Sequence, residues 1–406
     1  MRFLTRASSA ERRTLLASTL GWMLDGMDIT LYAMVIAELM RELHLSPSQA
    51  GLLASVTLIA SAAGGILFGI LADRAGRRTA LMISIAVYSV FTAACGMSRS
   101  LVELALFRFL LGLGMGGEWA TGAALVAETW RPEHRGKALG LMQSGFAVGY
   151  ALAAVLTALV LPHWGWRAVF FVGILPALIT FWIRRSVPES PLWLARSTHD
   201  STTASPHLGL FTAPYRNLVL VTLVMNSAAL FAWWGLFTWI PPYLALPVTQ
   251  GGRGLTVAAS SAWIVTMQVG MWLGYVSFGF ISDAVGRRKT YIGFLLLAAA
   301  LVPLYARAQS PLALLLLGPL VAFFGTGHFT GFGIITAELF PTSFRTSAMG
   351  LTYNAGRAVS AAAPWVLGTV AAHCNLSSAF WISGLAFLAA GLLALGVPET
   401  RRRPLE

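Results

Sequence analysis

The chain has 406 residues, of which 57% are hydrophobic and only 11% charged, and its mean hydropathy is +0.71. Because a soluble globular chain is about 25% charged, this composition excludes an ordinary cytosolic enzyme and a disordered chain, and two cysteines are too few for a disulfide scaffold. The sequence therefore predicts a polytopic helical membrane protein, and its net charge of +12 must be explained by where the cations lie.

Twelve apolar runs are long enough to cross a bilayer as helices, which takes about 20 residues each. The first run follows a basic N-terminus that resembles a signal peptide, but it contains Asp25 and Asp28 and is long enough to span, so we expect a retained first helix. The runs lie near residues 14–40, 50–72, 79–98, 103–128, 138–161, 166–185, 217–240, 260–282, 290–306, 312–336, 347–370 and 379–397.

The cations divide unevenly between the two sides of these spans. Of the 28 Lys and Arg residues, 21 fall on the side of the N-terminus and five on the other side, while Arg108 and Arg357 lie inside spans. By the positive-inside rule, both termini are predicted to be cytoplasmic, in the inner membrane of the cell. The net charge then serves membrane insertion, and no nucleic-acid partner is expected.

Three segments recur at an offset of 210 residues, so the chain is predicted to consist of two repeats in the same orientation. Residues 69–78 recur as 279–288, Glu128 recurs as Glu338, and 187–189 recur as 397–399. The predicted organisation is a six-helix bundle over 1–185, a polar cytoplasmic linker over 186–216 and a second six-helix bundle over 217–406. Transporters built from such repeats hold their site near the membrane midplane.

The loop at 69–78 resembles the signature that follows the second helix of major facilitator superfamily transporters. Arg108 with Gly112, and the run at 188–191, resemble further motifs of that superfamily. The resemblance implies an all-α membrane fold of twelve transmembrane helices in two pseudo-symmetric six-helix bundles. Within the superfamily, the aspartates of the first span and the segment 116–119 resemble the sialate/carboxylate:proton and aromatic acid:proton symporters. Leu192 and Ala284 depart from the family pattern, where basic residues are common.

Ionisable residues near the middle of spans are costly in lipid and usually serve a function. Asp25 and Asp28 share a face of the first span, and Glu118 lies mid-span 4. A carboxyl group in a low-dielectric cavity can load and release a proton. We expect proton coupling by Asp25, Asp28 and Glu118, with Arg108 as a switchable partner of Asp28; a permanent structural salt bridge is the alternative.

Arg357 is the best candidate to anchor an anion, since a guanidinium binds a carboxylate through two parallel hydrogen bonds. The alternative is that it only neutralises a carboxylate of the first bundle. The further candidates for substrate binding lie mid-span as well: Asn354, Tyr353, His328, Gln143 and Trp119. For His328, the counterpart of Glu118 in the repeat, a packing role is an equal alternative.

Charged residues repeated at one end of the helices are predicted to form ion pairs that gate the cytoplasmic side. They are Asp73, Arg77, Arg78, Glu128 and Arg135 in the first repeat, and Asp283, Arg287, Glu338 and Arg345 in the second. Topology determination alone is the alternative reading.

No pattern in the sequence indicates an enzyme, a cofactor or a metal site. The run at 112–117 satisfies G-x-G-x-x-G, but it lies inside an apolar span and follows no strand, so close helix packing is expected there. We therefore predict a secondary active transporter that takes up an organic anion with protons: a monocarboxylate, a sugar acid such as sialate, or an aromatic acid. Its partners would be this anion, protons and the lipid bilayer, and it would act as a monomer. The alternatives are a proton-coupled exporter or facilitator of sugars or drug-like solutes, and a non-transporting membrane sensor.

Overall fold

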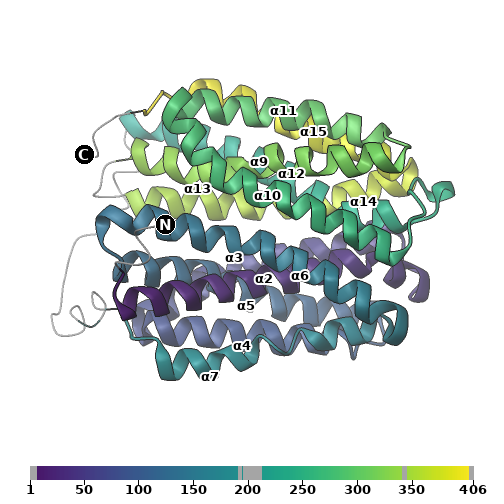
Figure 1. Ribbon diagram of the computed structural model, residues 1–406, viewed down its shortest axis with the longest axis horizontal. Coiled ribbons are helices and arrows are strands. Elements are labelled where there is room, and N and C mark those ends of the chain that lie inside the picture. Colours follow the sequence, from purple (N-terminus) through teal and green to yellow (C-terminus); the bar gives the residue numbers. More distant parts are fainter. Residues whose placement is uncertain (1–6, 191–193, 195–212, 341–344, 402–406) are drawn as a thin grey trace. The chain divides into compact units, whose positions relative to one another are not determined.

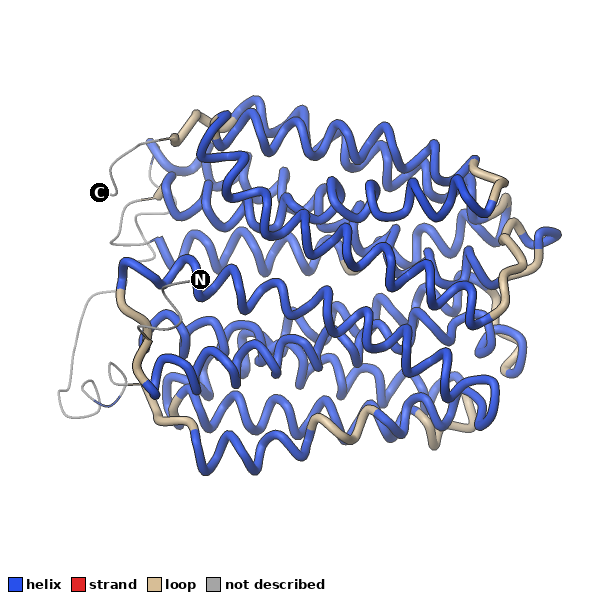
Figure 2. The backbone as a smooth tube through the Cα atoms, viewed as in Figure 1, coloured by secondary structure: helices blue, strands red, loops and turns tan. Residues whose placement is uncertain are grey.

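In the computed structural model of the chain, the described residues are 7–190, 194, 213–340 and 345–401. They form helices joined by short loops, with no strand among them (Figure 2). The predicted all-α membrane fold is therefore confirmed.

The first repeat contains six helices, labelled in Figure 1. A capping box formed by Ser8 and Glu11 starts the first of them, satisfying backbone N–H groups that have no partner within the helix. Their bounds are α2 (Ser9–Glu42), α3 (Pro47–Ala75), α4 (Arg77–Cys95), α5 (Leu101–Thr129), α6 (Pro132–Val172) and α7 (Ala177–Ser186).

The second repeat has the corresponding helices, with one of them broken in two. The bounds are α9 (Ala213–Ala245), α10 (Val257–Val285), α11 (Arg287–Arg307), α12 (Pro311–Leu339), α13 (Arg345–Ser360), α14 (Ala363–His373) and α15 (Leu376–Leu393). Short 3₁₀ turns at Val248–Gln250 and Ala394–Gly396 complete it.

Among the described residues, nine helical segments are long and apolar enough to cross a membrane. One of these, Ala138–Ile183, contains two of the twelve predicted spans. The predicted boundary near 161–166 agrees with the structure, because two helices meet there at a kink at Gly165, where φ is +73°, a value that glycine tolerates. The remaining predicted spans correspond to α5 and to the α13–α14 pair.

The predicted continuous span at 347–370 was wrong. The chain leaves the helix at Ala361 and Ala362, and α14 begins with Pro364 in its first turn. Proline has no N–H to donate and its ring clashes with the preceding turn, so the helix ends before it and a new one starts.

Contacts divide the chain into two compact units, each described here by itself. Unit 1 comprises Met1–Leu43 and Val56–Thr202, and unit 2 comprises His44–Ser55 and Thr203–Glu406. The first turns of α3 thus belong to unit 2, where Ser48 Oγ lies 2.9 Å from Thr369 Oγ1 of α14. The domain boundaries predicted from sequence stay a prediction, and most of the predicted linker lies outside the described residues.

The packing within each unit repeats at the sequence offset of 210. In unit 1, a Cβ on Gly64 would overlap the backbone of Leu113, and in unit 2 a Cβ on Gly274 would overlap the backbone of Phe323. Glycine is needed at both places because the two helices touch backbone to backbone. This close approach brings α5 against α3, and α12 against α10, and it fixes the positions of the polar residues on α5 and α12.

Candidate functional site

Glu118 is completely buried in unit 1, and its carboxylate lies directly against the backbone of α2. A Cβ on Gly21 would overlap Glu118 Oε1, and it would also contact the side chain of Ile85 in α4. Neither carboxylate oxygen has a hydrogen-bond partner among the described residues. Burying a carboxylate in this way is costly unless the group changes its protonation state, so this position suits a proton carrier.

Asp25 and Asp28 are both 1% exposed and lie on the same face of α2 as expected from their spacing. The charge of Asp25 acts on both Asp28 and Glu118, so the three carboxyl groups belong to one buried cluster. Asp28 Oδ2 accepts a hydrogen bond from Thr92 Oγ1 of α4 at 3.1 Å. Three buried carboxyl groups whose charges act on one another cannot all be ionised cheaply in a low dielectric, which favours proton uptake by at least one of them.

Helix α4 supplies a polar stripe to this cluster that the sequence reasoning missed. Tyr88, Thr92 and Cys95 are all buried and recur at helical spacing on one face. The signal in the sequence was this stripe of polar residues within an apolar span. Gly21 was missed as well, since a helical glycine shows its purpose only when its neighbour is known.

Arg108 is 1% exposed, and its guanidinium lies 3.6 Å from the centroid of the Tyr32 ring. A cation over an aromatic face is attracted by the electron-rich face of the ring. The charges of Arg108 and Asp28 both act on the Cys95 thiol, so the two residues border the same buried region. The predicted Asp28–Arg108 switch stays a prediction.

Trp119 and Gln143, both predicted to bind substrate, are brought together in unit 1. Trp119 Nε1 donates to Gln143 Oε1 at 3.1 Å, joining α5 to α6. On the α2–α6 interface, the rings of Trp22 and Phe146 lie 5.3 Å apart. The indole and amide are therefore oriented by one another, as residues that recognise a ligand usually are.

Arg357 lies in the last turn of α13, just before the helix break, and is 4% exposed. The neighbouring Gly356 packs against Asn226 of α9, whose amide donates to Thr352 O at 3.2 Å, so the backbone carrying Arg357 is held firmly. A cation at this position also suits the negative end of the helix dipole. Its Nε has no hydrogen-bond partner among the described residues, which leaves it able to bind an anion.

The other substrate-binding candidates of unit 2 fall into two places. Tyr353 and Asn354 are half-buried on α13, with the Tyr353 ring 6.3 Å from that of Phe332. His328 is fully buried, stacked on Phe329 at 4.4 Å and edge-on to the rings of Tyr291 and Phe387. These contacts resemble those of a packing histidine, and its role in substrate binding stays a prediction.

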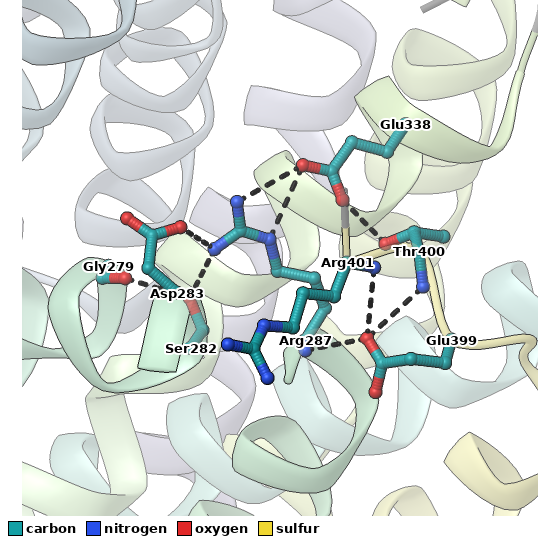
Figure 3. A network of polar contacts seen from close by, with 8 residues as sticks. All are labelled: Gly279, Ser282, Asp283, Arg287, Glu338, Glu399, Thr400 and Arg401. Atoms are coloured by element: carbon teal, nitrogen blue, oxygen red, sulfur yellow. Dashed lines mark hydrogen bonds and ion pairs between the residues drawn. The ribbon is translucent and has the colours of Figure 1, made fainter. Parts of the chain in front are cut away.

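In unit 2, the residues predicted to gate form a connected network at the end of α10, α11 and α12 (Figure 3). The Arg287 guanidinium lies between Asp283 and Glu338, 3.3 Å from Glu338 Oε1, and is ion-paired with both. Thr400 Oγ1 donates to the second oxygen of Glu338 at 2.5 Å. Glu399 accepts the backbone N–H of Arg287 at 2.7 Å.

The backbone donors around Glu399 decide its protonation. Burial raises the pKa of this carboxyl, but backbone hydrogen bonds from Arg287, Arg401, Arg288 and Thr400 outweigh it and hold the pKa below its ordinary value. Glu399 thus stays ionised near neutral pH and fastens the end of the chain to the start of α11.

Unit 1 repeats this network at the same offset. Arg77 Nη2 lies 3.3 Å from Glu128 Oε1, and Ser190 Oγ donates to the other oxygen of Glu128. Glu189 accepts the backbone N–H of Arg78 at 3.1 Å, and Glu399 accepts that of Arg287, one position before the counterpart of Arg78. Three predicted gating side chains, those of Asp73, Arg135 and Arg345, lie outside the described residues.

Among the described residues, no group of three or more His, Cys, Asp or Glu side chains could hold a metal ion. The buried ionisable groups described above include three carboxyl groups in unit 1 and a guanidinium at a helix break in unit 2.

The sequence profile of the Major Facilitator Superfamily matches residues 19–277 and 244–406 of the chain. The chain is 31% identical to the sialic acid transporter NanX of Escherichia coli, covering 95% of this chain and 94% of that protein. It is also 31% identical to a cis,cis-muconate transport protein of Acinetobacter baylyi, again covering 95% and 94%. Among solved structures, a D-xylose-proton symporter superposes with a TM-score of 0.78, at 20% identity and over 98% of this chain and 100% of that one, which shows the shared fold.

Proposed function

The chain belongs to the Major Facilitator Superfamily, and on that premise we propose that it takes up a small organic anion together with protons by alternating access. The chain is a multi-pass membrane transporter of this superfamily. The proposed substrate is a carboxylate: a monocarboxylate, a sugar acid or an aromatic acid. One relative carries a sialic acid and another carries muconate, and both of these molecules are carboxylates.

The observation that carries this proposal is the separation of charge between the two units. Unit 1 buries Asp25, Asp28 and Glu118 to 1% exposure or less, and unit 2 buries Arg357 to 4%. A carboxyl cluster can take up and release protons, whereas a guanidinium prefers carboxylates. A sugar facilitator needs neither group.

In the proposed mechanism, the acids of unit 1 are the proton carriers and Arg357 is the anion anchor, with Tyr353, Asn354, Gln143, Trp119 and His328 contributing to recognition. Protonation neutralises part of the cluster and lowers the cost of moving it through a low-dielectric interior. The ion pairs Arg77–Glu128 and Arg287–Glu338 bias the equilibrium between conformations, since a network that breaks as a whole can separate two states.

The proposed location is the inner membrane, with both termini cytoplasmic, and the proposed working form is a monomer. The excess of Lys and Arg on one side of the spans supports this orientation. Fusion of a reporter that is active only in the periplasm to the C-terminus tests it: signal from such a fusion would contradict the proposed orientation.

Uptake into liposomes tests the transport proposal. The purified chain is reconstituted and offered radiolabelled sialic acid, cis,cis-muconate and benzoate, each with and without an inside-alkaline pH gradient. We expect at least one of these to accumulate only when the gradient is present. A facilitator would ignore the gradient, an exporter would require the opposite one, and a sensor would move none of the probes.

The matched variant is Asp28→Asn, which keeps the size of the side chain and removes its titration. We expect gradient-driven accumulation to fall by at least about 10-fold because the carrier can no longer release a proton there. Exchange of internal for external substrate, which needs no net proton movement, should persist. Full accumulation in this variant would remove Asp28 from the mechanism.

A further inference from the structure

The end of α7 gathers cations from three helices of unit 1. Arg13 Nη1 of α2 donates to Ser186 O at 3.3 Å, and Arg78 Nη1 of α4 donates to Val187 O at 3.2 Å. Arg185 is exposed in the last turn of α7 itself. Because the two carbonyl groups belong to adjacent residues, the three arginines lie at one helix end.

These arginines have hydrogen-bond donors to spare. The last carbonyl groups of a helix need partners from outside it, and cations suit the negative end of its dipole. A guanidinium has five N–H donors, however, and Arg13 and Arg78 each donate here through a single nitrogen. Glu189, the acid that follows α7, accepts the backbone N–H of Arg78. None of the guanidinium groups of Arg13, Arg78 and Arg185 has a carboxylate partner among the described residues, so most of their donors are available to an anion.

The helix surface next to these cations is apolar and exposed. On α7, Leu178 is 62% exposed and Phe181 is 68% exposed, and Arg185 follows them at helical spacing on the same face. On α2, Leu16 is 49% exposed and lies one turn from Arg13. In a multi-pass membrane protein, such apolar faces contact the acyl chains of lipids, and long cationic side chains at helix ends extend to the head-group region.

Unit 2 keeps only one of the three cations at the corresponding helix end. There, Arg288 Nη1 donates to a backbone carbonyl at 3.3 Å, as its counterpart in unit 1 does. The positions that correspond to Arg13 and Arg185 hold Leu223 and Leu395, and Leu395 is 59% exposed. One arginine is therefore enough to close this helix end, and the other two cations of unit 1 need a different explanation.

The chemistry of this helix end matches an anionic lipid. The proposed orientation places it on the cytoplasmic side, where the membrane leaflet carries anionic lipids and where basic pockets between transmembrane helices bind phospholipid head groups. A guanidinium gives a phosphate two parallel hydrogen bonds. Unused N–H donors next to an apolar, exposed helix face thus suit a molecule with an anionic head and apolar tails.

We propose that Arg13, Arg78 and Arg185 form a binding site for the head group of an anionic phospholipid. The phosphate lies among the three guanidinium groups, and the acyl chains lie along the exposed face of α7 that contains Leu178 and Phe181. The bound lipid fastens the start of α2 to the end of α7. The site goes beyond the proposed uptake of an organic anion and rests only on the proposed orientation in the membrane.

Native mass spectrometry of the full chain in detergent tests this site. The delipidated protein is titrated with dioleoyl phosphatidylglycerol, which is anionic, and with dioleoyl phosphatidylcholine, which has the same acyl chains and no net charge. We expect the anionic lipid to bind at least about 10-fold more tightly, and this preference to fall to about twofold or less in the double variant Arg13→Gln with Arg185→Gln. Equal binding of the two lipids by the wild type would overturn the proposal, and so would an unchanged preference in the double variant.

The matched control removes the same number of cations from the corresponding end of unit 2. The double variant Arg288→Gln with Lys289→Gln leaves the end of α7 intact, and we expect its preference for phosphatidylglycerol to stay within about twofold of that of the wild type. A loss as large as that caused by the changes at Arg13 and Arg185 would show a general attraction of the anionic lipid to basic helix ends, and would overturn the proposed site.

Inorganic phosphate distinguishes a lipid head group from a free anion. At equal ionic strength, set with chloride, we expect millimolar phosphate to leave phosphatidylglycerol bound, because burial of the acyl chains adds to the affinity of the lipid. Displacement by phosphate but not by chloride would overturn the assignment to a lipid.

Arg185→Gln alone gives the readout if the double variant does not fold. The Arg185 side chain makes no hydrogen bond or ion pair with any described residue, so its loss leaves the packing of unit 1 intact. We expect the preference for phosphatidylglycerol to fall by at least about threefold, and an unchanged preference would overturn the site. None of these measurements uses a transported solute, so a failure of the lipid site is distinguishable from a failure of the proposed uptake.

Discussion

The two units carry the same contacts at one end of their helices and different chemistry in the middle. At the end, Arg77–Glu128 in unit 1 and Arg287–Glu338 in unit 2 have the same N–O distance of 3.3 Å. In the middle, Glu118 of unit 1 corresponds to His328 of unit 2, and the positions that correspond to Asp25 and Asp28 hold Gly235 and Thr238.

This comparison separates what the repeat needs as a scaffold from what each unit does. The ion pairs and the caps that close the helix ends serve both units alike, so both kept them. The buried charges differ because the units perform different tasks, carboxyl groups for protons in one and a guanidinium for anions in the other. The counterpart of Arg357 in unit 1 is Ala147, so the anion anchor has no duplicate.

The largest expected effect is loss of anion binding on substitution of Arg357 by Ala. Removing a buried guanidinium that pairs with a carboxylate should weaken binding by about 100-fold or more, since the anion is left unpaired in a low dielectric. Arg357→Lys should lose about 10-fold, because the ammonium keeps the charge but not the two parallel hydrogen bonds. Calorimetry with sialic acid, cis,cis-muconate and benzoate measures both. Unchanged affinity in Arg357→Ala would break the assignment of anion binding to unit 2.

Substitution of Gly21 by Ala tests whether the acidic cluster depends on a notch in α2. The new methyl group would overlap Glu118 Oε1, so the carboxylate must move. We expect the free energy of unfolding to fall by about 1–3 kcal/mol. Thermal unfolding in detergent measures the change. As a control, Gly293 of α11 has open space around it, and Gly293→Ala should raise stability by up to about 1 kcal/mol. If the two substitutions changed stability equally, the position of Glu118 would not depend on the space left by Gly21.

The symmetry of the helix ends predicts equal effects of Glu128→Gln and Glu338→Gln. Each substitution removes the charge of a glutamate that lies 3.3 Å from an arginine nitrogen in a part-buried ion pair. Each glutamate also accepts a hydrogen bond from a hydroxyl group, that of Ser190 or that of Thr400. We expect each to lower the free energy of unfolding by about 1–2 kcal/mol, measured by thermal unfolding. If the losses of unfolding free energy in the two variants differed by more than about 2 kcal/mol, the two networks would not be equivalent, and the predicted symmetry would be wrong.

The smallest effect concerns pH and Glu399. Because hydrogen bonds hold the pKa of this carboxyl below its ordinary value in the folded chain, its contribution to stability is complete above the unfolded-state pKa, about 4.3. The contribution is lost as the pH falls through the lower folded-state value. The difference in thermal unfolding between the wild type and Glu399→Gln should therefore stay constant between pH 7 and pH 5, and it should shrink below about pH 4. A difference that shrinks between pH 7 and pH 5 would contradict this.

Much of the fold could be predicted because it depends on patterns that repeat along the chain. Apolar runs of about 20 residues, the offset of 210 and the charged loops identified a twelve-helix transporter with two repeats. The break before Pro364 could not be placed, since a proline can either kink a helix or start one. The neighbouring helices decide between these outcomes.

The candidate site could be predicted as a set of residues but not as a set of contacts. Asp25, Asp28, Glu118 and Arg357 were identified by the cost of their charges in an apolar span. The pairing of Trp119 with Gln143, the stacking of Arg108 on Tyr32, and the position of Glu118 against Gly21 were not predictable, because each joins residues from different helices.

The sequence by itself determined the membrane class, the two repeats and the identity of the buried charges, because hydropathy and charge act residue by residue along the chain. Only the tertiary structure decided that Thr92 of α4 donates a hydrogen bond to Asp28 of α2, and that α13 ends one turn after Arg357. Those features depend on how closely helices approach one another, and that is set by packing among residues far apart in the sequence.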